Sequence, residues 1–92
     1  MRVHDFRPTK QFTTQLSRLS PHQQARVKQA LCQVLVDLSD PQLRAHRLKG
    51  QFAGTISISA GGDLRIHLRL VGGGGSTVAI VDAVGTHSQL YR

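Results

Sequence analysis

Apolar and polar residues alternate strictly in two stretches of the second half of this chain. Residues 55–59 and 64–70 both alternate at every second position, and a pair of glycines separates them. Such alternation is typical of strands with one buried face, and glycines between two such runs predict a hairpin. Residues 77–84 form a third, more continuously apolar run. We therefore expect three strands that follow one another in a meander.

The glycine turn also predicts how the first two strands pair. A two-residue loop would set Ile58 beside Arg65 and mix core and polar side chains on both faces. A three-residue loop that includes Asp63 pairs Ile58 with Ile66 and keeps one face apolar, so we predict this loop. For the glycine-rich hairpin that follows, the register stays open. A four-glycine loop sets Arg65 opposite Asp82, and a five-residue loop does not.

The first half of the chain has a helical period. Apolar residues recur every three or four positions within 9–19 and again within 21–38, which predicts two helices that each bury one stripe. The stretch 20–23 has the residue types of a helix capping box, and residues 1–6 suit a short strand. We expect one α+β domain over 1–92, in which the strand and helix hairpin pack on one face of a small antiparallel sheet.

Charge and cysteine content limit the classes of function. The chain has 12 Lys and Arg against 5 Asp and Glu, a net charge of +7. This balance favours a polyanionic partner, although basic residues also serve solubility. One cysteine excludes an internal disulfide, and the singly spaced histidines predict neither a metal site nor a cofactor. Without a signal peptide or a membrane-length apolar run, we expect a cytoplasmic protein with no membrane partner.

The polar face of the predicted sheet allows two interpretations. Five polar residues of the first two strands share this face: Ser57, Ser59, Arg65, His67 and Arg69. Arginine can bind phosphate, and small hydroxyl side chains let an RNA strand approach. An antiparallel sheet also commonly leaves one face to solvent. The pattern alone favours the ordinary solvated face.

Three stretches resemble the RelE/ParE superfamily of small bacterial toxins, and most of all its YafQ branch. They are AHRLKG at 45–50, GGDLRIHLRL at 61–70 and VGTHSQLY at 84–91. The order of strand, helix hairpin and meander is also that of the family. The resemblance implies a RelE-like fold and a type II toxin that cleaves mRNA in the ribosomal A site. It further implies a hetero-oligomer with a cognate antitoxin, and mRNA and ribosomal RNA as partners.

The resemblance also implies which residues carry the chemistry. His46, Asp63 and His87 match catalytic positions of the YafQ branch, and Arg65 matches a phosphate-stabilising arginine of the wider RelE group. Cleavage by the RNA's own 2′-hydroxyl needs a base at that oxygen, an acid at the leaving 5′-oxygen and positive charge at the phosphorus. Histidine suits either proton role. We assign His87 to the acid, His46 with Asp63 to the base side, and Arg65 to the developing charge.

The expected RNA-binding residues are Tyr91, Arg69, His67, Lys49 and Ser59. Tyr91 matches the C-terminal aromatic residue of the family. Ser59 departs from the family, which carries a histidine there, and the loss of one proton-transfer group predicts a slower enzyme. Two alternatives to a ribonuclease stay open. One is a non-catalytic, ParE-like inhibitor of gyrase, and the other is a weakened toxin kept as an operon-regulating partner of its antitoxin.

Overall fold

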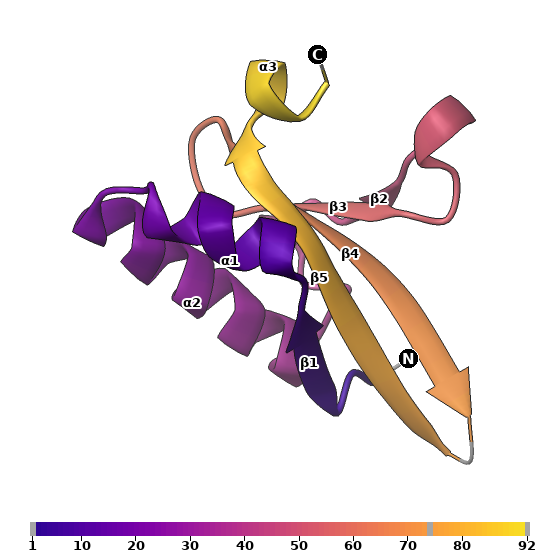
Figure 1. Ribbon diagram of the computed structural model, residues 1–92. Coiled ribbons are helices and arrows are strands. Elements are labelled where there is room, and N and C mark those ends of the chain that lie inside the picture. The colour runs from indigo at the N-terminus through magenta and orange to yellow at the C-terminus, as the bar shows by residue number, and fades with distance from the viewer. Residues whose placement is uncertain (1, 74, 92) are drawn as a thin grey trace.

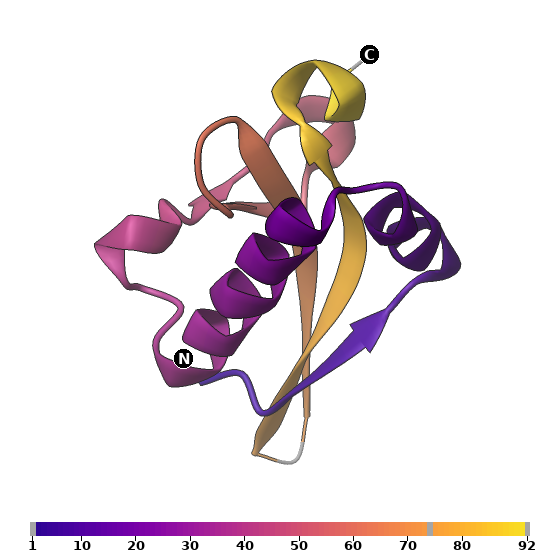
Figure 2. The same cartoon turned by 90° about the vertical axis from the view of Figure 1, so that its left-hand side faces the viewer.

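A computed structural model describes residues 2–73 and 75–91, which form three α-helices, two short 3-10 helices and one five-stranded sheet (Figure 1). In chain order the elements are β1 (Asp5–Pro8), α1 (Lys10–Ser17), α2 (Pro21–Val36), η1 (Pro41–Leu43), β2 (His46–Arg47), η2 (Gly50–Phe52), β3 (Ile56–Ser59), β4 (Leu64–Gly73), β5 (Ser76–Thr86) and α3 (His87–Leu90). Helices α1 and α2 lie together on one side of the sheet (Figure 2). The expected α+β class, with its N-terminal strand and helix hairpin, is confirmed.

The sheet is mixed, with the strand order β1-β5-β4-β3-β2. Strands β3, β4 and β5 pair antiparallel, as expected. The short strand β2, which the sequence did not predict, pairs antiparallel with β3, whereas β1 lies at the other edge and runs parallel to β5. Parallel neighbours need a long crossover connection. Here the helix hairpin and the other three strands separate β1 from β5 along the chain. The pairing of β1 with β5 adds a parallel strand to one edge of the antiparallel meander.

The first hairpin has the predicted register. Ile58 pairs with Ile66, which confirms the three-residue loop that includes Asp63. Gly61 and Gly62 have φ angles of +99° and +54°, and glycine adopts this left-handed region without the steric cost of a side chain. The two glycines thus fix which side chains of β3 and β4 face the helices.

The paired strands of the second hairpin extend further into the glycine run than either loop considered from the sequence would allow. The ladder between β4 and β5 continues to the pair Gly73 and Ser76, so the first glycines of the run belong to the strand. Backbone hydrogen bonds need no side chain, and for this reason the ladder extends into the glycines. Arg65 lies opposite Gly85 rather than Asp82.

The core lies between the sheet and the two longer helices. Strand residues on this face are aliphatic and buried: Ile56, Ile58, Leu64, Ile66, Leu68, Ala79, Val81 and Val84. They pack against buried residues of the helices: Phe12, Val27, Ala30 and Val34. None of the helices within the described parts of the chain has the length and apolar content to cross a membrane.

The capping residues expected from the sequence are in place. The Ser20 hydroxyl accepts a hydrogen bond from the Gln23 amide at 3.1 Å, and the Gln23 side chain accepts one from the Ser20 amide at 3.1 Å. This reciprocal box satisfies two backbone donors that the first turn of α2 would leave free. At α1, which carries no such box, the Thr9 hydroxyl accepts from the Phe12 backbone amide at 3.1 Å and caps the helix with a single bond.

Candidate functional site

The polar positions of the strands form two rows on the sheet face away from α1 and α2. Cross-strand pairing joins His46, Ser57, His67 and Ala83 in one row. It joins Ser59, Arg65 and Gly85 in the other. The rows are two residues apart along each strand, a spacing of about 7 Å. Two histidines and one arginine singled out from the sequence therefore share one patch.

His67 lies at the centre of this patch and is buried, with 3% of its surface exposed. The Tyr91 hydroxyl makes a hydrogen bond of 3.1 Å with its Nε2. The Phe52 ring meets both rings edge to face, with centroids 5.7 Å from His67 and 5.2 Å from Tyr91. Burial lowers the pKa of His67 and His46 adds to this, while the Asp82 carboxylate opposes it. The imidazole is therefore neutral at neutral pH.

His87 is exposed at the start of α3, directly after β5. Thr86 caps this helix, because its hydroxyl accepts from the Gln89 amide at 3.4 Å and the Gln89 side chain accepts from the Thr86 amide at 2.8 Å. Gly85 permits the close return of the chain, since a Cβ at this position would lie 2.9 Å from Gln89 Oε1. The Tyr91 ring lies 4.5 Å from that of His87, centroid to centroid. Tyr91 therefore joins the exposed histidine to the buried patch.

Arg65 is fixed beside the glycine turn. Its guanidinium donates to the carbonyl oxygens of Gly62 at 2.9 Å and Leu64 at 3.1 Å. The same group donates to the Ser59 hydroxyl at 3.4 Å. Ser59, where the toxin family carries a histidine, thus helps to orient the arginine. Asp63 is exposed in the same turn.

His46 and Lys49 lie at the opposite edge of the patch. Both side chains are exposed, and Nδ1 of His46 lies 3.0 Å from the carbonyl oxygen of Arg44. Across the strands, His46 faces Ser57, whereas Asp63 belongs to the turn beyond the end of β3. No hydrogen bond or ion pair joins His46 to Asp63 within residues 2–73 and 75–91. Their joint role as a base stays a prediction.

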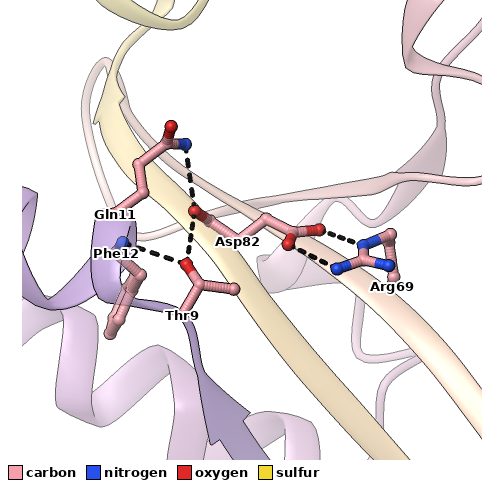
Figure 3. A network of polar contacts seen from close by, with 5 residues as sticks. All are labelled: Thr9, Gln11, Phe12, Arg69 and Asp82. Atoms are coloured by element: carbon pink, nitrogen blue, oxygen red, sulfur yellow. Dashed lines mark hydrogen bonds and ion pairs between the residues drawn. The ribbon is translucent and has the colours of Figure 1, made fainter.

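Arg69 is engaged by a carboxylate at the rim of the patch (Figure 3). Its guanidinium donates to both oxygens of Asp82, at 2.5 and 2.8 Å, and this hydrogen-bonded pair raises the pKa of Arg69. Asp82 is the extra residue of a β-bulge in β5. Its backbone carbonyl oxygen accepts from the Thr9 hydroxyl at 3.0 Å and from the side-chain Nε2 of Gln11 at 3.1 Å. Residues at the start of α1 thus provide hydrogen bonds to the Asp82 carbonyl group, which the bulge leaves without a partner in the strand pairing.

A cavity of about 610 Å³ opens beside these residues. Its wall contains four glutamine side chains, from Gln11, Gln15, Gln51 and Gln89, together with Phe52, His67 and the ion pair of Arg69 with Asp82. Amide groups around an aromatic ring are a lining that suits an unstacked nucleobase. The described residues contain no group of three or more His, Cys, Asp or Glu side chains arranged to hold a metal ion.

Sequence reasoning missed two residues of this site. Phe52 lies in a 3-10 turn outside any periodic run, and no signal marked it. Asp82 did carry a signal, because it is the one acid within the apolar run 77–84. An acidic residue in an otherwise apolar strand indicates either a partner of opposite charge or an irregularity of the strand, and the structure contains both.

No family model and no curated protein matches the sequence. Solved structures do match. A YoeB/ParE toxin from Agrobacterium tumefaciens is similar with a TM-score of 0.77 and 16% identity, over 91% of this chain and 99% of that chain. The E. coli DinJ-YafQ toxin-antitoxin complex is similar with a TM-score of 0.76 and 12% identity, over 100% of both chains. The toxin-antitoxin complex RelBE2 from Mycobacterium tuberculosis is similar with a TM-score of 0.69 and 25% identity, over 96% and 95% of the two chains.

Nearly complete coverage in both directions means that these structures share the whole arrangement of strands and helices with this chain, at low sequence identity. The chain therefore has the fold of the RelE/ParE toxin superfamily, which YafQ shares.

Proposed function

We propose that this chain is the toxin of a bacterial type II toxin–antitoxin system and an endoribonuclease that cleaves mRNA on the ribosome. The observation that carries the proposal is the position of His87, which is exposed, lies against the Tyr91 ring and directly follows β5, two residues after the Gly85 that pairs with Arg65. The solved structures of similar fold include YafQ, YoeB/ParE and RelBE2 toxins, which supports the same reading.

The proposed chemistry follows from the RNA itself. The 2′-oxygen attacks the adjacent phosphorus and loses its proton, and the bond from phosphorus to the 5′-oxygen breaks. His87 donates a proton to the leaving 5′-oxygen, and His46 with Asp63 receives the 2′ proton. Arg65 stabilises the charge on the phosphorane. The products are a cyclic phosphate and a free 5′-hydroxyl, and neither a metal ion nor a cofactor takes part.

The remaining polar residues bind rather than react. Tyr91 and Lys49 offer a stacking ring and a cation to the RNA. The charge of Arg69 is already balanced by Asp82, so we expect it to contribute less to phosphate binding than Arg65. Ser59 replaces a proton-transfer group, and alignment of the mRNA by the ribosome offsets part of that loss, because positioning can contribute about 7–11 kcal/mol.

The proposed partner in the cell is an antitoxin. The net charge of +7 attracts an acidic segment and speeds its association. The YafQ and RelBE2 structures of similar fold are toxin-antitoxin complexes. We propose a cytoplasmic hetero-oligomer of the same kind.

The second candidate is a toxin without catalysis. A YoeB/ParE toxin is among the structures of similar fold, and Ser59 removes one histidine from the expected catalytic set. Such a protein would inhibit gyrase, or would persist as a weakened toxin in a regulatory complex. Neither role requires a proton from His87.

The test compares growth arrest and mRNA 5′ ends after induction of the wild type and of His87→Ala in a bacterium. Loss of the acid should lower cleavage by roughly 10²–10⁴-fold and remove both arrest and cuts. His22→Ala is the matched control, because His22 is exposed in the first turn of α2. Arrest that persists without cuts in His87→Ala would support the gyrase inhibitor, and no arrest in the wild type would support the weakened toxin.

A further inference from the structure

We propose that His67 is a positioning residue: through its hydrogen bond with the Tyr91 hydroxyl it holds α3, and with it His87, against the sheet. The effect on catalysis rests on the proposed function, whereas the effect on the position of α3 does not. The resemblance to YafQ assigns no role to this histidine, and its place on the polar face predicts either an RNA-binding residue or an ordinary cross-strand contact.

The residues around His67 allow its ring to extend in one direction, away from the sheet and toward Tyr91. Its neighbours in the row are Ser57 and Ala83, both small and buried. The imidazole stands out from the sheet between them and reaches Tyr91 at 3.1 Å. Phe52 covers its side at 5.7 Å. A buried polar ring with a single partner loses free energy when that partner is removed, so the contact constrains both residues.

Helix α3 needs such an anchor. It spans only His87–Leu90, and a helix of one turn is not stable by itself in water. Its cap, Thr86 with Gln89, ties it to the end of β5 but not to the sheet face. Tyr91, the next residue, supplies that second attachment. Its hydroxyl end contacts His67 and its ring contacts His87 at 4.5 Å, so a displacement of Tyr91 displaces the proposed acid.

Several charged or titratable groups surround His67, and none of them replaces Tyr91 as its partner. Asp82 is engaged with Arg69, and His46 acts on His67 through charge across the row. His87 contacts Tyr91 on its other side. A neutral imidazole can donate or accept and an imidazolium can donate, so a hydroxyl can bond either form. Protonation of His67 alone therefore does not remove its hydrogen bond with Tyr91, whereas substitution of either residue does.

The test uses three variants and their combinations. Tyr91→Phe keeps the ring but removes the hydroxyl, His67→Leu removes the imidazole, and His67→Gln keeps a side chain that can hydrogen-bond. The position of α3 is read from the NMR signals of the His87 ring, which the Tyr91 ring current displaces. Ribosome-dependent cleavage is measured on the same proteins, with His22→Leu as the control on an exposed histidine.

We expect Tyr91→Phe and His67→Leu to move the His87 signals toward those of a free peptide and to slow cleavage by a similar factor, roughly 3- to 10-fold, as loss of one hydrogen bond implies. The double variant should be no slower than either single one, because the two residues act through one contact. His67→Gln should retain more activity than His67→Leu. Multiplied losses in the double variant, or unmoved His87 signals in Tyr91→Phe, would overturn the proposal.

Cleavage of mRNA and the His87 NMR signals distinguish a failure of the proposed function from a failure of the proposed positioning role. If the wild type cleaves no mRNA, the proposed function fails, and the His87 signals still decide whether His67 positions α3. If His67→Leu does not fold, Tyr91→Phe carries the test, since it removes a single oxygen atom.

Discussion

The two faces of the central sheet are both buried at their centres, but by different means. On the helix face, aliphatic residues of β3, β4 and β5 pack against apolar residues of α1 and α2. On the site face, Ser57, His67 and Ala83 are buried, and Phe52 and Tyr91 cover His67. These two covering residues come from a 3-10 turn and from the C-terminal end of the chain.

This difference separates stability from the geometry of the site. Apolar burial is non-directional and grows with area, so the helix face supplies most of the free energy of folding. The site face depends on a few directional contacts, each of modest free energy. Substitutions on the helix face should lower stability with little change in the site of the folded protein, and substitutions on the site face should do the opposite.

The largest expected effect is on the helix face. Ile66 is completely buried, and Ile66→Ala should lower the free energy of unfolding by about 2–5 kcal/mol through lost burial and the cavity left behind. Urea unfolding measures this loss. The His87 NMR signals of the folded variant should stay where they are in the wild type. A loss under about 1 kcal/mol, or displaced His87 signals, would show that the two faces are not separate in this way.

A smaller effect on stability, with a larger effect on the site, is expected from Gly85→Ala. The new Cβ would lie 2.9 Å from Gln89 Oε1 and 3.3 Å from Gln89 Cβ, so Gln89 must move, and we expect its side chain to lose the hydrogen bond that caps α3 at the Thr86 amide. Loss of a cap lowers stability by about 0.5–2 kcal/mol, whereas α3 should leave its position together with His87. Thermal unfolding and the His87 signals report the two effects.

Gly73→Ala is the matched control, because a Cβ there meets nothing within 4 Å. It should leave both the unfolding temperature and the His87 signals close to those of the wild type. If Gly85→Ala lowers stability but keeps α3 in place, then the close return of the chain is not what positions His87.

The helix face was predictable from the sequence for the same reason that it is robust. Alternation in β3 and β4 shows which side chains are apolar, and the glycine turn allows one register that keeps them together, as the pairing of Ile58 with Ile66 confirms. Helical spacing in the first half of the chain predicts the two helices that cover this face. Each of these signals is local in the sequence and repeats several times, so one irregular residue does not hide it.

The cover of the site face could not be predicted from periodicity. His67 was correctly placed on the polar face, but its burial depends on Phe52 and on Tyr91, 24 residues further along the chain. Neither belongs to an alternating run. The bulge at Asp82 leaves no periodic trace either, because one extra residue in a continuously apolar strand disturbs no alternation, and only the isolated acid marks its place. The pairing of Arg69 with Asp82 follows from that bulge, and the sequence alone left the register of this hairpin open.

The smallest expected effect on stability comes from removing a charge on the site face. Asp82→Asn removes one partner of an ion pair whose arginine side chain is 48% exposed, so stability should fall by only about 0.2–1 kcal/mol. The same change acts on His67. The carboxylate of Asp82 raises the pKa of His67 against the larger effect of burial. Its removal, which also frees the charge of Arg69, should therefore lower the pKa of His67 further.

The sign of the pH dependence follows from this shift. Because the folded protein holds the pKa of His67 below its ordinary value of 6.5, the unfolded chain binds more protons in the interval between the two values. The part of the stability that depends on a neutral His67 is complete above about pH 6.5 and is lost as the pH falls through that interval. Asp82→Asn should deepen this loss, and His67→Gln should abolish it. NMR titration of the His67 ring measures its pKa, and unfolding of each variant at two pH values measures the loss of stability. An unchanged or higher pKa of His67 in Asp82→Asn would mean that the carboxylate does not raise the pKa of the buried ring.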